Sequence, residues 1–157
     1  MFVKVELEDV IDNPFFEAPF LVLKEKDGQR CCTIDVGLME ATIIANQCEG
    51  VVPPRPMPHD LMVDALTKAG ASVKAVYIES EKSHTYYATV HIENKSSGVE
   101  QVDARPSDAI LLALKENCPI YLNERLFTGD QCHSSAKEPD VLDALMIPLL
   151  KRSSNCY

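Results

Sequence analysis

The sequence predicts an α+β fold: a single domain in which helices pack around one buried central helix on a mixed, largely antiparallel sheet. Three observations support this prediction. Strand-like segments come in groups, first as a hairpin and then as a three-stranded meander, rather than alternating with helices as in a doubly wound sheet. The helical segment 109–114 is apolar on every side, which is typical of a buried helix. The length of 157 residues suits one domain.

The first elements are a strand, a hairpin and a helix. Residues 2–11 alternate polar and apolar side chains, the pattern of a half-exposed strand. Segments 20–23 and 31–36 are apolar runs joined by an Asp-Gly turn, and they predict a β-hairpin. Residues 38–47 predict a helix, because apolar side chains recur at helical spacing along them.

A stiff linker and a second helix follow. Four prolines between positions 53 and 58 make this linker extended and rigid. Residues 58–68 predict a helix that ends at Gly70. The apolar side chains expected on one face of this helix are Leu61, Met62, Ala65 and Leu66.

The rest of the domain is the meander, the buried helix and a short strand at 120–122. The three meander strands are predicted at 73–81, 85–93 and 99–104. Beyond the domain, which we place at 1–127, the segment 128–157 predicts a polar linker and an amphipathic helix at 141–150.

Composition restricts the function classes. The net charge of −9 gives no basic surface on average, so RNA or DNA can only be weakly held. Aromatic residues are few, and we expect no platform for stacking bases. There is no apolar run of membrane-spanning length and no signal-peptide pattern, which predicts a cytoplasmic protein with no membrane contact.

The six cysteines form no C-x-x-C pair. In a cytoplasmic protein they are expected to be buried or incidental thiols. The alternative is a metal site that uses Cys132, His133 and Cys156, although their spacing matches no standard zinc pattern.

Two similar phrases stand at helix starts, Arg55-Pro56-Met57-Pro58-His59-Asp60 and Arg105-Pro106-Ser107-Asp108. Proline suits the first helical position, where its missing N–H has no intrahelical partner. An Asp two residues later lies in the first turn, where the helix dipole favours a carboxylate. We expect the two phrases to lie close together in space and to form one site.

These phrases supply the groups that phosphodiester hydrolysis requires. His59 could transfer a proton, and Arg55 or Arg105 could bind a phosphate through the guanidinium fork. Carboxylates could hold a divalent cation such as Mg²⁺. The candidate carboxylates are Asp60, Asp108, Glu40 and Asp103.

Each candidate also has a purely structural interpretation. His59 could pack at the end of the linker, and Asp60 and Asp108 could simply be helix-start carboxylates. Glu40 could be an ordinary helix residue. Arg105 precedes an apolar helix, so we expect it to be partly buried and paired with Asp108, Asp103 or Asp60.

Five segments in the same order resemble the bifunctional nuclease domain family. The resemblance covers about residues 1–127 and implies a compact α+β domain, often oligomeric, and an activity on both RNA and DNA, as described for plant members. The segments that carry it are Leu23-Lys24-Glu25-Lys26-Asp27-Gly28, Ile34-Asp35-Val36-Gly37 with Glu40-Ala41, Pro53-Pro54-Arg55-Pro56-Met57-Pro58-His59-Asp60-Leu61, Asp103-Ala104-Arg105-Pro106-Ser107-Asp108-Ala109-Ile110 and Pro119-Ile120-Tyr121.

Two functions follow as expectations. One is a nuclease of low sequence selectivity, with its catalytic groups at the two helix starts. The other is a non-enzymatic, oligomeric binding or regulatory module in which the Arg–Asp motifs are structural. In either case we expect a homodimer, because the meander leaves a sheet edge that a partner commonly covers.

Overall fold

The structure is a computed structural model and describes residues 1–12 and 18–127. Within this part of the chain, seven strands form one sheet in the order β3-β2-β1-β7-β4-β5-β6. Neighbouring strands are antiparallel except for β4 and β7, which are parallel. The predicted α+β class with a mixed, largely antiparallel sheet is therefore confirmed. The strands are β1 (Phe2–Ile11), β2 (Phe20–Glu25), β3 (Cys31–Asp35), β4 (Ala71–Lys82), β5 (Thr85–Asn94), β6 (Gly98–Ala104) and β7 (Ile120–Asn123).

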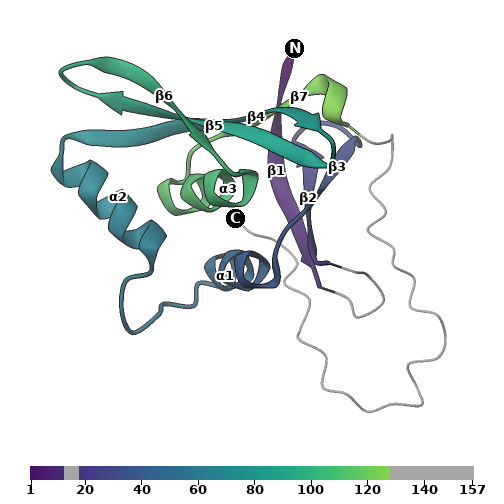
Figure 1. The fold of residues 1–157 in the computed structure, drawn as a ribbon, viewed down its shortest axis with the longest axis horizontal. Coiled ribbons are helices and arrows are strands. Elements are labelled where there is room, and N and C mark those ends of the chain that lie inside the picture. Colours follow the sequence, from purple (N-terminus) through teal and green to yellow (C-terminus); the bar gives the residue numbers. More distant parts are fainter. Residues whose placement is uncertain (13–17, 128–157) are drawn as a thin grey trace.

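Three helices lie together on one face of this sheet (Figure 1). They are α1 (Leu38–Cys48), α2 (Pro58–Lys68) and α3 (Pro106–Glu116), and a short 3₁₀ turn, η1 (Glu124–Leu126), follows β7. The predicted central helix is α3, which contacts α1, α2, β4 and β5. Its residues 109–113 are all buried. No described helix covers the opposite face of the sheet (Figure 1).

The core fills the space between the helices and the sheet. Alternate side chains of the central strands point into it, as the period of two along a strand requires. The most fully buried large side chains come from the sheet and from α1 and α3, and they include Leu21, Leu23, Ile34, Ile44, Ile78, Ile110 and Leu122. This packing fixes the first turn of α3 against α1, which places the candidate site.

The helix ends follow the sequence signals. Asn117 adopts a left-handed backbone conformation with φ of 51° and ends α3, two residues before a proline. Gly70, with φ of 75°, follows the last residues of α2 in the same way.

The apolar face predicted for α2 is wrong in part. Leu61 and Met62 are exposed, at 66% and 46% of their surface, and Ala65 is exposed as well. The side chains of α2 that pack against the core are Val63 and Leu66. The reason is that the main contacts of α2 are with α3 and β4, so a narrow stripe of the helix is covered.

The cysteines fit the expectation only in part. Cys32 and Cys118 are free thiols, and burial raises the pKa of each to about 11. Cys31 and Cys48 are each one half of a disulfide bond, which the sequence did not lead us to expect.

Three predictions lie outside the described residues: the polar linker 128–139, the helix at 141–150, and the metal site built on Cys132, His133 and Cys156. Within the described ranges, none of the helices is both long and apolar enough to cross a bilayer.

Candidate functional site

Helices α2 and α3 begin in the same way. Each has an extended N-cap residue and a proline at the first helical position. The two helix starts match in their Pro-x-Asp residues but not in their arginines. Arg105 is the N-cap residue of α3, whereas Arg55 lies two residues before Met57, the N-cap residue of α2. In order from the N-cap, the matched residues are Met57 and Arg105, Pro58 and Pro106, His59 and Ser107, and Asp60 and Asp108.

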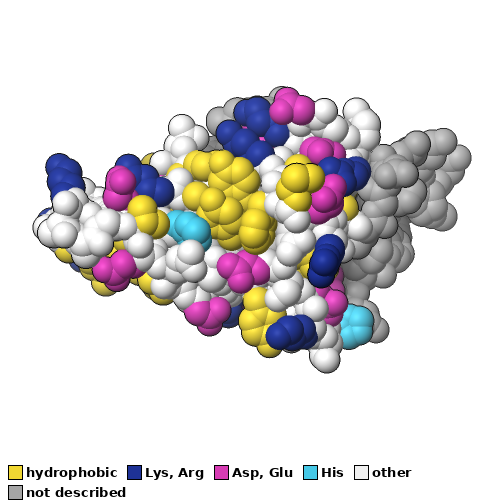
Figure 2. All heavy atoms as spheres, turned by 90° about the horizontal axis from the view of Figure 1, so that it is seen from above, with side chains coloured by type: hydrophobic (Ala, Val, Ile, Leu, Met, Phe, Trp, Pro, Cys, Tyr) yellow, Lys and Arg dark blue, Asp and Glu magenta, His cyan; other side chains and the backbone are white. Residues whose placement is uncertain are grey.

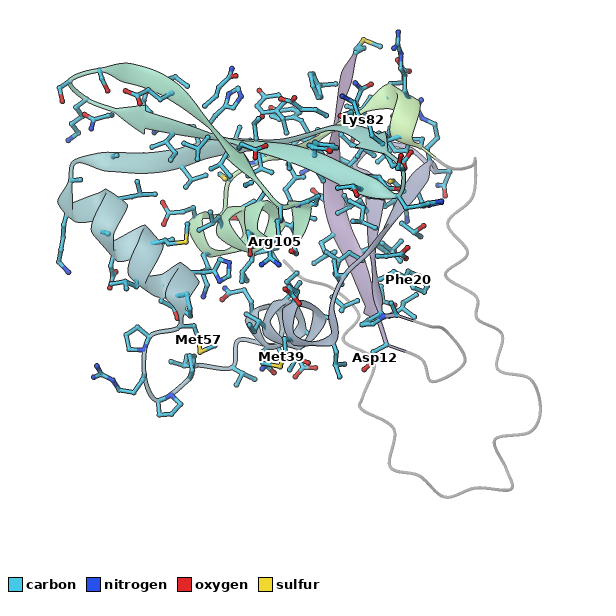
Figure 3. The ribbon with its side chains drawn as sticks, in the orientation of Figure 1. Asp12, Phe20, Met39, Met57, Lys82 and Arg105 are labelled. Atoms are coloured by element: carbon cyan, nitrogen blue, oxygen red, sulfur yellow. The ribbon has the colours of Figure 1, made fainter. Side chains whose placement is uncertain are left out.

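Arg105 joins two carboxylates. Its Nε is 2.7 Å from Oδ2 of Asp108 and its Nη2 is 3.0 Å from Oδ1, so the guanidinium donates to both oxygens of one carboxylate. Its Nη1 donates to Oε1 of Glu40 on α1, at 2.9 Å. Figure 3 shows Arg105 between the sheet and α1. The expected pairing with Asp108 is confirmed, whereas the expected partial burial is wrong, because the Arg105 side chain is 65% exposed.

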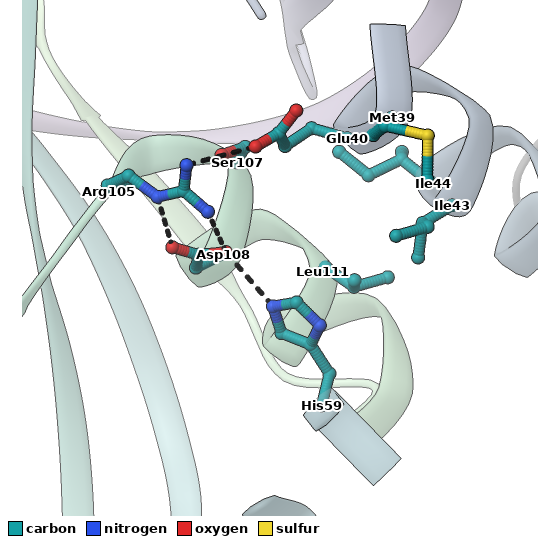
Figure 4. A pocket seen from close by; sticks show the side chains of 9 residues that line it. All are labelled: Met39, Glu40, Ile43, Ile44, His59, Arg105, Ser107, Asp108 and Leu111. Carbon is teal, nitrogen blue, oxygen red and sulfur yellow. Dashed lines mark hydrogen bonds and ion pairs between the residues drawn. The ribbon is translucent and has the colours of Figure 1, made fainter. Parts of the chain in front are cut away.

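His59 brings the first phrase into contact with the second. Its Nε2 is 3.0 Å from Oδ1 of Asp108, and its side chain is only 15% exposed (Figure 4). The expected proximity of the two phrases is therefore confirmed through this pair. The other ring nitrogen, Nδ1, is buried and has no hydrogen-bond partner among the described residues.

The charges around Asp108 determine its protonation. Burial raises the pKa of its carboxyl group, but the hydrogen bonds from Arg105 and His59 outweigh burial, and the net pKa lies below the ordinary value. The same contact with Asp108, together with Glu40, raises the pKa of the Arg105 guanidinium. Asp108 is thus a carboxylate at neutral pH and can only accept hydrogen bonds.

A small cavity of about 90 Å³ lies beside this cluster (Figure 4). Its walls come from the beginnings of all three helices, so the site depends on their packing. One side is charged, and the other is formed by apolar side chains of α1 and α3. The lining residues are Met39, Glu40, Ile43, Ile44, His59, Arg105, Ser107, Asp108 and Leu111.

Asp60 does not join this cluster. Its Oδ1 accepts from Nζ of Lys115 on α3 at 2.5 Å, and its Oδ2 accepts from the backbone N–H of Met57 at 2.7 Å. The hydrogen bond from Lys115 is the main cause of the lowered pKa of Asp60. Lys115 also donates to Gln47 of α1 at 2.9 Å. Adjacent residues of α2 therefore contribute to two different polar networks, because side chains one position apart point about 100° apart around a helix.

Two other candidates lie away from the cluster. Arg55 is exposed in the linker and has no ion pair or hydrogen bond within the described part of the chain. Asp103 is opposite Thr89 in the sheet, on the side that does not face the helices. Side chains alternate along a strand, and Ala104 therefore takes the helix-facing position next to Arg105. The prediction that Arg55 and Asp103 belong to the site is not supported by this geometry.

Sequence reasoning missed other residues of the two networks. Ser107 lines the cavity, and it could have been found from its place in the second phrase, which matches that of His59 in the first. Lys115 and Met39 carried no local signal, because each reaches its partners only through helix packing.

The predicted metal site does not fit the side chains present. No group of three His, Cys, Asp or Glu residues within the described ranges is arranged to hold a metal ion. Asp108 and Glu40 are both bound to Arg105, while Asp60 is bound to Lys115. The carboxylates are thus distributed between two cationic partners rather than directed at one point.

Both Pro-x-Asp helix starts and most of the fold around them lie in a segment that matches a known domain family. The family model for the bifunctional nuclease domain matches residues 21–135, and the chain belongs to this family. A protein of Mycobacterium tuberculosis H37Rv, named only as uncharacterised, is 40% identical over 106 residues, which are 68% of this chain and 62% of that protein.

Plant relatives are more distant. Bifunctional nuclease 1 of Arabidopsis thaliana is 28% identical over 115 residues, which are 71% of this chain and 35% of that protein. Bifunctional nuclease 2 of Oryza sativa subsp. japonica is 28% identical over 119 residues, which are 74% of this chain and 37% of that protein. The chain thus spans about a third of the length of the plant nucleases and under two thirds of the mycobacterial protein.

Proposed function

We propose that this protein hydrolyses phosphodiester bonds of RNA and DNA with low sequence selectivity. The observation that carries the proposal is the contact of His59 with Asp108, which is itself bound by Arg105. This arrangement combines an oriented imidazole with a cation that has access to solvent. Membership of the family and the names of the plant relatives support the same activity.

Arg105 is the group that would bind the phosphate. A guanidinium has five N–H donors, and three of them are used by Asp108 and Glu40. The remaining N–H groups belong to a side chain that is 65% exposed. Glu40 and Asp108 hold the guanidinium plane in place, so its outer edge is oriented before a phosphate arrives.

His59 is the group that would transfer a proton. Because Asp108 is a carboxylate, Nε2 of a neutral His59 must carry the hydrogen, and Nδ1 then keeps the lone pair of a base. An Asp that fixes the tautomer and orientation of a His is a recurring device in acid–base catalysis. Nδ1 is the ring nitrogen without a partner among the described residues. Because it is buried, the attacking hydroxyl or water must enter the cavity beside His59 before Nδ1 can take its proton.

The carboxylates of Glu40, Asp108 and Asp60 are bound to Arg105 and Lys115. The two proposed steps, phosphate binding by Arg105 and proton transfer by His59, therefore use none of them as a metal ligand. A divalent cation could still promote the reaction by screening the repulsion between a polyanion and a protein of net charge −9. We therefore expect Mg²⁺ to act mainly on substrate binding and to be replaceable in part by monovalent salt.

The experiment is a nuclease assay on single-stranded and duplex RNA and DNA, with Mg²⁺ and with a chelator. Wild type, His59→Ala and the control His84→Asn are purified in parallel. His84 lies in the β4–β5 turn with φ of 61°, a conformation that Asn tolerates. We expect His59→Ala to lose about a hundredfold or more of the turnover and His84→Asn to retain it. Activity that survives in folded His59→Ala would contradict the assigned site. Activity that varies with the preparation and not with the amount of protein would identify a contaminant and contradict the proposal.

The second candidate function is a non-enzymatic binding or regulatory module. The observation that favours it is that the charged groups already satisfy one another beside a cavity of only about 90 Å³, too small for a nucleotide. On this interpretation Glu40, Arg105, Asp108 and His59 hold three helices together. Loss of stability in His59→Ala, with no activity in any preparation, would favour this function.

A further inference from the structure

The face of the sheet opposite the helices carries a cluster of rings. Tyr77 stacks on Tyr121 with 4.9 Å between ring centroids and an interplanar angle of 20°. His91 lies on the other side of Tyr77 at 4.2 Å, and Phe2 meets Tyr77 edge-on at 5.1 Å. These residues belong to β1, β7, β4 and β5, which are four consecutive strands of the sheet. The low aromatic content of the chain therefore does not prevent four rings from gathering at one place on this face.

Strand register places this cluster on the uncovered face. Tyr121 and Tyr77 are directly opposite each other, and neither is among the inward-facing core residues. Figure 2 looks onto this face and shows hydrophobic side chains gathered beside a histidine. The Phe2 side chain is 44% exposed. Four neighbouring rings on a solvent-facing surface form the kind of apolar patch that marks an interaction site.

We propose that a second copy of this chain binds here, with the ring-bearing faces of the two sheets in contact. The ionic groups around the rings support a protein partner. Lys74 pairs with Glu93 at 2.9 Å, and Lys26 pairs with Glu6 at 2.8 Å. An apolar aromatic centre within a polar rim is the usual anatomy of a protein interface. Because these charges are locally balanced, these two pairs add no like-charge repulsion between two copies.

Two further side chains give the face charge complementarity with a copy of itself. Lys4 is opposite Tyr121 in the β1–β7 ladder and has no anionic partner within the described ranges. The Glu79 carboxylate accepts from Thr89, which is opposite Tyr77, and it has no cationic partner there either. When two sheets meet face to face, the two-fold axis lies parallel to them. An axis that runs between Lys4 and Glu79 would bring Lys4 of each copy toward Glu79 of the other, since an isologous interface repeats every contact twice.

A single-stranded nucleic acid is the occupant that the observations do not favour. Tyr77 is covered by Tyr121 on one side and by His91 on the other, so its ring faces are not open to a base. Two of the nearby cations, Lys26 and Lys74, are paired with carboxylates. A polyanion needs the opposite arrangement, with open ring faces and unpaired cations.

The test is the mass of the full chain by light scattering at micromolar concentrations. We expect wild type at twice 17.4 kDa, and Phe2→Lys and Tyr121→Lys at the mass of a monomer. Val102→Lys is the matched control, because Val102 is 47% exposed on the edge strand β6 and lies opposite the buried Val90, on the helix side of the sheet. It should remain dimeric. Circular dichroism checks that each variant folds. If Tyr121→Lys does not fold, Phe2→Lys alone tests the proposal.

A charge swap tests the interface geometry. Lys4→Glu and Glu79→Lys should each weaken the dimer at least tenfold, and the double variant should recover most of that loss. Three results would overturn the proposal: a monomeric wild type, a dimer unaffected by both ring variants, or a dimer broken only by Val102→Lys. Binding of a labelled oligonucleotide by a monomeric wild type, lost in Phe2→Lys, would assign the face to nucleic acid instead. None of these measurements depends on nuclease activity.

Discussion

His59 and Asp108 are 49 positions apart in the chain, and their side chains meet at 3.0 Å. Each lies in the first turn of a helix that begins with proline. The contact makes Asp108 the shared acceptor of Arg105 and His59, so the cation and the imidazole cannot be oriented independently. A change at Asp108 is therefore expected to affect both.

Asp108→Ala removes the acceptor of three hydrogen bonds. We expect the free energy of unfolding to fall by about 1–2 kcal/mol, since the Arg105 part of the network is exposed and screened by solvent. Nuclease turnover should fall by about a hundredfold or more. Urea denaturation and the assay on the folded variant measure the two effects. Unchanged turnover in folded Asp108→Ala would contradict the assigned site.

Arg105→Lys should be far more damaging than Arg55→Lys. A lysine cannot bind both oxygens of Asp108 and reach Glu40 at once, because it lacks the planar fork. Arg55 has no such contacts within the described ranges, so its replacement by lysine changes little. We expect at least a tenfold loss of kcat/KM for the first variant and less than a twofold change for the second. Equal losses in both would show that the linker arginine also acts on the substrate.

Lys115→Met should loosen the start of α2. It removes the donor to Asp60 and Gln47 and leaves the Asp60 carboxylate without its cation. Because Asp60 then keeps a partly buried negative charge without a cation beside it, we expect the free energy of unfolding to fall by about 1–3 kcal/mol. The matched control is Lys68→Met, because Lys68 is an exposed lysine in the last turn of α2. Similar unfolding midpoints for both variants would mean that the Lys115 network adds nothing to stability.

Stability should fall in acid through Asp60 and Asp108. The hydrogen bond from Lys115 lowers the pKa of Asp60 in the folded protein, and at Asp108 the bonds from Arg105 and His59 exceed the opposing effect of burial. A carboxyl group with a lowered folded pKa stabilises the protein above its unfolded pKa of about 3.9, and this contribution is lost as pH falls through the folded value.

Asp60→Asn provides the measurement. The difference in unfolding free energy between wild type and this variant should be greatest near neutral pH. It should shrink from about pH 4 downward, because a protonated Asp60 resembles the amide. A difference that stays constant from pH 7 to pH 3 would show that the ion pair with Lys115 does not depend on the charge of Asp60.

The sequence predicted the elements better than it predicted the site. Alternation and turn residues placed every described strand and helix within a few positions, because these signals are local. The Pro-x-Asp phrases identified His59 and Asp108 for the same reason. The sequence could not tell Asp60 from Asp108, because they hold the same position in their helices. Which network each carboxylate joins depends on where α3 places Arg105 and Lys115, and helix packing decides that.

The ring cluster is a second feature that the sequence could not predict. Phe2, Tyr77, His91 and Tyr121 are scattered along the chain, and no pair of them forms a motif. Only the strand order places them on neighbouring strands. A low aromatic content was therefore a poor guide to whether aromatic side chains gather at one place.

The last strand of the described chain, β7, lies in the middle of the sheet, between β1 and β4. The first three strands and the three strands of the meander have no ladder with each other and are joined through β7 alone. During synthesis, the edges of β1 and β4 that pair with β7 therefore stay unpaired until residues 120–123 leave the ribosome. A chain cut short before Ile120 would retain both helix-start motifs but lose the strand that joins the two halves of the sheet beneath them.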